Sequence, residues 1–165
     1  MTLMKPIRFL ASLALAGMLT STAFGQATPI DRGSDNMKVV GHIPLGKHSS
    51  VTDIELEQDM DRPYAYVGRA SIVDGGPKGM DVIDLSNPAK PEVIYEFRLE
   101  YQDLLPNRGG MDVKYFKTGG RYYVVQSFEF SAGPHYELGA VLFDVTDLPN
   151  EPTEVGRWIL PDNPG

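Results

Sequence analysis

The chain has 165 residues, no cysteine, and 22 acidic against 15 basic residues, which gives a formal net charge of −7 at pH 7. Proteins that bind the nucleic-acid phosphate backbone need clustered lysine and arginine, so this balance argues against a nucleic-acid partner. The lack of cysteine excludes disulfides, thiolate metal sites and a lipoprotein anchor within this sequence.

The first 25 residues have the features of an export signal. Lys5 and Arg8 form a basic start, residues 9–19 form an apolar run, and the small residues Ala23 and Gly25 suit cleavage after residue 25. We therefore expect an exported protein that is periplasmic, secreted or held at the cell surface. The apolar run is shorter than a membrane span needs, and no later run approaches that length, so no membrane span is expected after signal removal.

A polar leader and one isolated apolar run come next. Residues 26–36 are polar and predict a flexible leader. Residues 37–44 (MKVVGHIP) are similar to segments 92–97 and 153–158, each of which ends a repeated unit. The run at 37–44 has no unit of its own. We therefore expect an orphan outer strand that completes a unit elsewhere.

Two repeated units follow, at residues 49–99 and 109–160. Each contains four short runs rich in β-branched and aromatic residues, separated by Gly, Pro, Asn and Asp, which is typical of antiparallel strands joined by turns. The closest match lies between residues 79–97 and 139–158. The expected strands are residues 51–56, 64–67, 80–85 and 92–97 in the first unit, and 110–115, 122–125, 141–145 and 153–158 in the second.

Asp84 and Asp144 end the third run of their units, 60 positions apart. A short carboxylate there can accept hydrogen bonds from the N–H groups of the following turn, so we predict turn caps rather than catalytic residues. The third runs are nearly continuous apolar segments, as in strands covered on both faces. Four-stranded sheets stacked around an axis, the blades of a propeller, cover their inner strands in this way.

Residues 82–91 (VIDLSNPAKP) and 142–147 (LFDVTD) resemble the LVIVD repeat of exported bacterial and archaeal β-propeller proteins. The resemblance extends from about Asn36 to the last residue. It implies an all-β fold of four-stranded antiparallel blades, a partial propeller over residues 37–165 with an incomplete ring. It carries no catalytic residues that could be transferred to this chain.

The last five residues (PDNPG) correspond to residues 106–110 (PNRGG), which lead into the second unit. A third unit would start at this point, and propellers need about four to eight blades to close. We therefore expect the sequence to be the N-terminal part of a longer protein. A chain of only two units would present apolar faces and unpaired edges, and we expect such a chain to self-associate.

Four residues are candidates for a binding site near the inner strands: His48, Asp53, Arg108 and Asp112. His48 and Arg108 precede the first strand of each unit, where loops open onto one end of a propeller near its axis. The alternative is that both are ordinary solvent-exposed loop residues with no role in binding. Asp53 and Asp112 recur inside the first strands. They could line the channel as an acidic ring that holds a cation, or they could make a hydrogen bond that links adjacent blades.

Recognisable catalytic motifs are missing from the sequence: it contains no nucleophile elbow, phosphate-binding loop, HExxH pair or cysteine metal set. We predict no catalytic residue, metal site or cofactor. The function that we expect is a non-catalytic binding or scaffold module for a protein, a glycan or a small-molecule ligand. The alternative is an extracytoplasmic enzyme whose axial metal-dependent hydrolase or oxidoreductase site is completed by further blades, because a metal needs three or four converging ligands.

Overall fold

The computed structural model describes residues 35–46, 50–71, 76–100, 108–129 and 139–159, and for Arg108 only the backbone. The expected export signal and most of the expected leader lie outside these ranges. The strands are β1 (Val51–Leu56), β2 (Tyr64–Ser71), β3 (Gly79–Asp84), β4 (Glu92–Arg98), β5 (Arg108–Thr118), β6 (Arg121–Glu129), β7 (Gly139–Asp144) and β8 (Thr153–Ile159).

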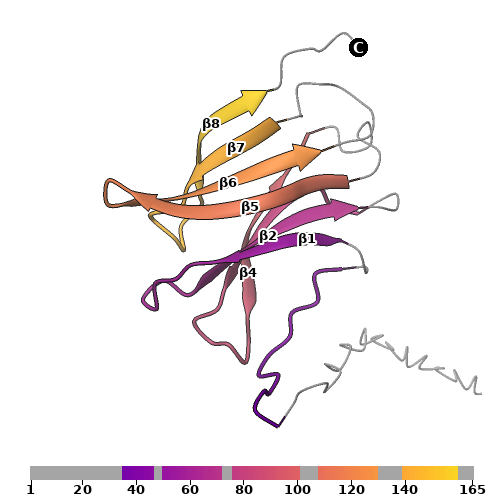
Figure 1. The fold of residues 1–165 in the computed structure, drawn as a ribbon, viewed down its shortest axis with the longest axis vertical. Helices are drawn as coiled ribbons and strands as arrows, with labels where there is room; N and C mark the ends of the chain where they lie inside the picture. The colour runs from indigo at the N-terminus through magenta and orange to yellow at the C-terminus, as the bar shows by residue number, and fades with distance from the viewer. Residues whose placement is uncertain (1–34, 47–49, 72–75, 101–107, 130–138, 160–165) are drawn as a thin grey trace, which may run out of the picture.

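Each repeated unit is a four-stranded antiparallel sheet whose neighbours follow chain order. Unit 1 pairs β1 with β2, β2 with β3 and β3 with β4. Unit 2 pairs β5 to β8 in the same way. The far end of β2 also pairs with the start of β5, through Ala70 with Gly109 and Ser71 with Arg108. The two units thereby form one curled sheet, shaped like half of a barrel (Figure 1).

The expected all-β class with antiparallel strands is confirmed, and the described ranges contain no helix. It follows that no helix in these ranges is long and apolar enough to span a membrane. Three strands are much longer than expected. β2 continues to Ser71, β5 runs from Arg108 to Thr118 and β6 continues to Glu129, because these extensions pair with each other or with the neighbouring third strands.

Glycine begins the third strand of both units for a steric reason. Gly79 and Gly139 have φ angles of 152° and 132°. A Cβ atom would lie 2.0 Å from the carbonyl oxygen of Phe97 at Gly79, and 1.9 Å from that of Trp158 at Gly139. Only glycine allows the fourth strand to approach so closely at this angle.

Asp84 and Asp144 cap the turns after the third strands, as predicted. The Oδ1 atom of Asp84 accepts a hydrogen bond from the N–H of Ser86 at 2.7 Å. The Oδ1 atom of Asp144 accepts one from the N–H of Thr146 at 3.0 Å. The same local chemistry therefore closes both third-to-fourth-strand turns.

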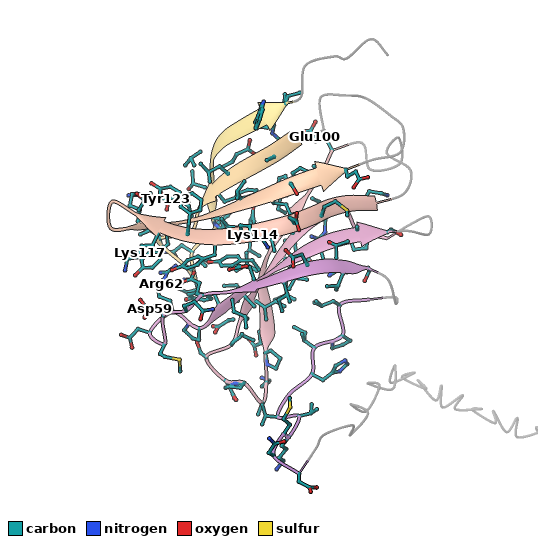
Figure 2. The ribbon with its side chains drawn as sticks, viewed as in Figure 1. Asp59, Arg62, Glu100, Lys114, Lys117 and Tyr123 are labelled. Carbon is teal, nitrogen blue, oxygen red and sulfur yellow. The ribbon has the colours of Figure 1, made fainter. Side chains whose placement is uncertain are left out.

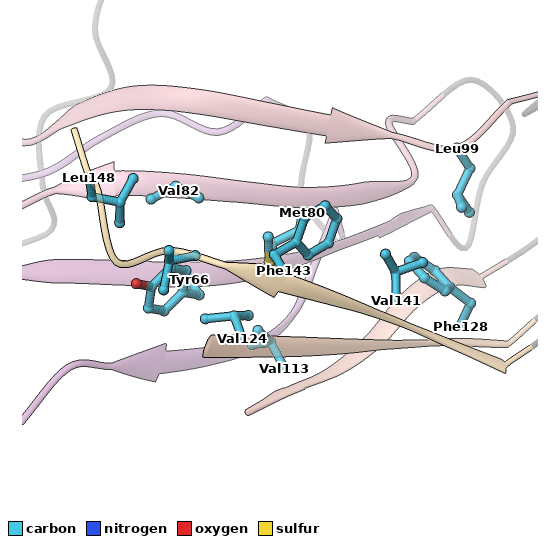
Figure 3. Close-up of a cluster of buried hydrophobic side chains, with 11 residues drawn as sticks. Tyr66, Met80, Val82, Leu99, Val113, Val124, Phe128, Val141, Phe143 and Leu148 are labelled. Atoms are coloured by element: carbon cyan, nitrogen blue, oxygen red, sulfur yellow. The ribbon is translucent and has the colours of Figure 1, made fainter. Parts of the chain in front are cut away.

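The main hydrophobic core lies between the two units and is built from both. Phe97 of unit 1 packs against Phe143 and Phe128 of unit 2, with ring centroids 4.9 Å and 6.1 Å apart. Figure 3 shows the buried side chains of this core, which are Tyr66, Met80, Val82, Leu99, Val113, Val124, Phe128, Val141, Phe143, Val145 and Leu148. The units therefore bury their apolar faces against each other.

Residues 37–45 pair with no strand of the described chain. Met37 and Val40 are exposed, whereas Ile43 and Leu45 pack against a small second core on the opposite face of unit 1. The prediction of an outer strand that completes another unit stays a prediction.

Candidate functional site

Asp53 on β1 forms a bridge to unit 2. Its Oδ2 atom accepts hydrogen bonds from the backbone N–H of Val113 at 3.1 Å and from Nζ of Lys114 at 2.9 Å. Its Oδ1 atom accepts the N–H of Ile54 at 2.9 Å. Asp53 thus makes a hydrogen bond between the units, which is one of the two alternatives given for it in the sequence analysis.

Lys114 on β5, labelled in Figure 2, contacts the carboxylate of Asp53, and the charges of Glu55 and Asp112 also act on it. Its Nζ atom is 3.8 Å from Oε2 of Glu55. The hydrogen bond to Asp53 raises the pKa of Lys114, and the charges of the three carboxylates raise it further. Burial raises the pKa of Asp53, but the hydrogen bonds from Lys114, Val113 and Ile54 outweigh it and lower the pKa. Both groups therefore stay charged. We call these four residues the inner-strand cluster.

Asp112 is exposed on β5, and its backbone is fixed by β6. Its N–H donates to Oγ of Ser127 at 3.1 Å, and its carbonyl oxygen accepts from Nε2 of Gln126 at 2.9 Å. The structure therefore joins Asp53 to Lys114, while Asp112 lies two positions before this lysine on the same strand. His48 lies outside the described residues, and for Arg108 the structure gives only the backbone, which begins β5.

The inner-strand cluster presents fixed charges. Three carboxylates around one lysine leave a negative balance, and the lysine side chain is 58% exposed. Among the residues that the structure describes, no group of three His, Cys, Asp or Glu side chains is arranged to hold a metal ion. The chemistry that this arrangement can perform is recognition by charge and hydrogen bonding.

A second polar group links the units near the C-terminal end of β5, where Figure 2 labels Asp59, Arg62 and Lys117. Glu57 has a fully buried side chain and pairs with Arg62, with Nε to Oε2 at 2.7 Å. The hydroxyl of Tyr66 donates a hydrogen bond to Glu57. Burial raises the pKa of Tyr66, and the hydrogen bond to Glu57 raises it further, so the phenol keeps its proton.

Arg62 also binds the turn between β7 and β8. Its guanidinium donates to the carbonyl oxygen of Thr146 at 2.9 Å and to that of Val145 at 2.7 Å. The guanidinium lies 4.0 Å from the ring centroid of Tyr122. Burial lowers the pKa of Arg62, but the hydrogen bond to Glu57 together with the charges of Glu57 and two tyrosines outweighs burial and raises it. We call Glu57, Arg62 and Tyr66 the arginine clamp.

Sequence reasoning missed Lys114 and the arginine clamp. A signal for the clamp exists in the repeat, because Arg62 and Arg121 each stand two positions before an equivalent tyrosine, Tyr64 or Tyr123. In unit 2 the arginine binds Asp144 of its own unit, with Nε to Oδ2 at 2.7 Å. The sequence shows that this arginine recurs in both units, but it does not show which carboxylate each arginine binds.

Comparisons of the chain with protein-family models, with curated proteins and with solved structures found no match.

Proposed function

We propose that the chain forms blades of an exported LVIVD-type β-propeller that acts as a non-catalytic binding or scaffold module. The observation that supports this proposal best is the contact between the units. Two four-stranded antiparallel sheets with the same motif face each other across a shared core, and their first strands are joined by Asp53. Face-to-face stacking of such sheets is the architecture of a propeller.

The inner-strand cluster is the binding surface in this proposal. Loops and first strands meet near the axis of a propeller, and Asp53, Glu55, Asp112 and Lys114 lie on the first strands of both units. The lysine among carboxylates favours a ligand with both donor and acceptor groups, such as a protein segment or a glycan. The export signal at residues 1–25 supports a partner outside the cytoplasm.

Photocrosslinking of the exported protein in the cells that produce it tests the proposal. Benzoylphenylalanine is placed at Glu55 or Asp112 in the cluster, and at Thr118 at the other end of β5 as the matched control. We expect one discrete adduct from both cluster positions and none from Thr118. A lack of adducts from Glu55 and Asp112 contradicts a binding role for this end.

Metal analysis of the purified exported protein separates this proposal from the enzyme alternative. We expect no stoichiometric metal. One bound metal ion per chain would overturn the non-catalytic proposal and favour a metal-dependent axial site.

A further inference from the structure

The two units expose opposite faces of their sheets, and the strand register shows which positions correspond. Phe97 pairs with Met80 as Trp158 pairs with Ala140, so Phe97 and Trp158 occupy the same position of their units. Phe97 is half-buried against unit 2, whereas Trp158 is 69% exposed. Trp158 is therefore largely exposed at the position where the equivalent residue of unit 1 packs against the next unit.

The rest of the surface around Trp158 follows from the same register. The unit 2 positions that correspond to core-facing residues of unit 1 are partly or largely exposed and mostly apolar. Phe116 and Tyr123 stack there with centroids 5.4 Å apart. We define the trailing face as Phe116, Tyr123, Val125, Leu142 and Trp158 on unit 2.

Unit 1 carries the complementary face. Ile54 corresponds to Val113, since Ile54 pairs with Val67 as Val113 pairs with Gln126. Val113 is fully buried between the units, but Ile54 is 57% exposed. We define the leading face as Ile54, Leu56, Ala65, Val67 and Ile83 on unit 1. Of this face, Ile54 and Leu56 are exposed, whereas its other residues are buried beneath Ile43, Leu45 and Leu85.

The leading face already carries the segment that precedes β1. Leu99, shortly before unit 2, is buried in the core between the units. Leu45, shortly before unit 1, packs against Ala65, Val67 and Ile83. The segment before β1 therefore covers part of the leading face, and Ile54 and Leu56 form the part that stays open to a further contact.

We propose that the trailing face of one copy of this chain binds the leading face of a second copy, head to tail. The occupant is a second copy because the contact inside the chain joins these same two types of face. A head-to-tail contact closes into a ring when the rotation fits. For a propeller of about four to eight blades, the ring contains about two to four copies of these two units. The inference rests on the proposed propeller architecture.

One pair of charges makes the contact between copies weaker than the contact within a chain. Within the chain, Asp53 binds Lys114. Between copies, the corresponding positions are Asp112 and Glu55, which are both acidic. The repulsion predicts that D112N, which leaves the Asp53–Lys114 pair intact, strengthens association by up to about fivefold.

Sedimentation velocity of the processed exported protein over a range of concentrations tests the proposal. We expect oligomers in the wild type and monomers in W158E and in I54E, because each variant keeps only one of the two faces. Met60 is 92% exposed in the β1–β2 connection and lies outside both faces, so M60E is the matched control and should associate like the wild type.

Mixing the two monomeric variants gives the decisive result. W158E keeps its leading face and I54E keeps its trailing face, so together they should form a 1:1 complex that grows no further. A misfolded variant could not do this, and a symmetric interface would not produce it. A monomeric wild type, or the lack of a 1:1 complex, overturns the head-to-tail inference. Photocrosslinked adducts of the inner-strand cluster with a molecule other than a second copy of this chain would still support the binding module.

Discussion

Arg62 provides the polar part of the contact between the units. It pairs with the buried carboxylate of Glu57 and donates to two carbonyl groups of the β7–β8 turn. A buried carboxylate is stable only while its partner remains, since the charge is otherwise left without compensation. The stability of the contact should therefore depend strongly on this one side chain.

R62A should lower the free energy of unfolding by about 3–5 kcal/mol, because it leaves the charge of Glu57 buried and unpaired. Denaturant titration measures the change. K90A is the control, since Lys90 and Glu92 form an ion pair with side chains 77% and 62% exposed. Such pairs contribute about 0–1 kcal/mol. Equal losses for R62A and K90A would contradict the assigned role of the clamp.

The charge of Asp144 should make the free energy of unfolding depend on pH in the acid range. Hydrogen bonds from the hydroxyl and N–H of Thr146 and the guanidinium of Arg121 outweigh burial and lower the pKa of Asp144. A carboxyl group with a lowered folded-state pKa stabilises the fold above its unfolded pKa of about 3.9, and this contribution is lost as the pH falls through the folded pKa. As the pH is lowered from about 5 to about 2, the free energy of unfolding of D144N should therefore fall less than that of the wild type. Identical pH profiles from denaturant titrations would show that Asp144 does not contribute.

At the scale of the strand, the glycine that begins the third strand determines how closely the fourth strand approaches. G79A and G139A should each destabilise the fold by about 1–3 kcal/mol, because alanine resists the positive φ and its Cβ would clash with a backbone carbonyl group. Thermal unfolding followed by circular dichroism measures the effect.

Gly156 on β8 provides the control for both glycine variants. A Cβ atom there would meet nothing within 4 Å. G156A should therefore leave the midpoint within a few degrees of the wild type. If G156A were as harmful as G139A, the steric explanation would be wrong, and the loss would have to come from the strand itself.

The sequence contained enough local signal to predict these elements, but not the partners across the units. Asp84 and Asp144 were predictable caps because a turn requires only nearby residues. The bond of Asp53 to Lys114 joins residues 61 positions apart, and the register between the two units does not follow from either repeat. Asp81 is a further example. It lies in a nearly apolar run and is fully buried, and its partners Arg69 and Arg98 come from the two neighbouring strands.

At the scale of the whole molecule, the two units share one core and should unfold together. Tyr66, Met80 and Val82 of unit 1 are buried in the same cluster as Val124 and Phe143 of unit 2. The main core is lost when either unit unfolds, and the second core of unit 1 contains only Ala65, Val67 and Ile83. Small domains with one core usually unfold in a single transition.

F97A tests this coupling, because Phe97 belongs to unit 1 and the only tryptophan, Trp158, belongs to unit 2. We expect fluorescence and circular dichroism to report one coincident transition, shifted in F97A by about 3 kcal/mol through loss of packing against Phe128 and Phe143. V93A, at a 36% exposed position of β4, should shift it by less than about 1 kcal/mol. Measurements at low protein concentration keep association from contributing. Independent transitions from the two probes, or a tryptophan signal that F97A leaves unchanged, would show that each unit folds alone and that the shared core does not couple them.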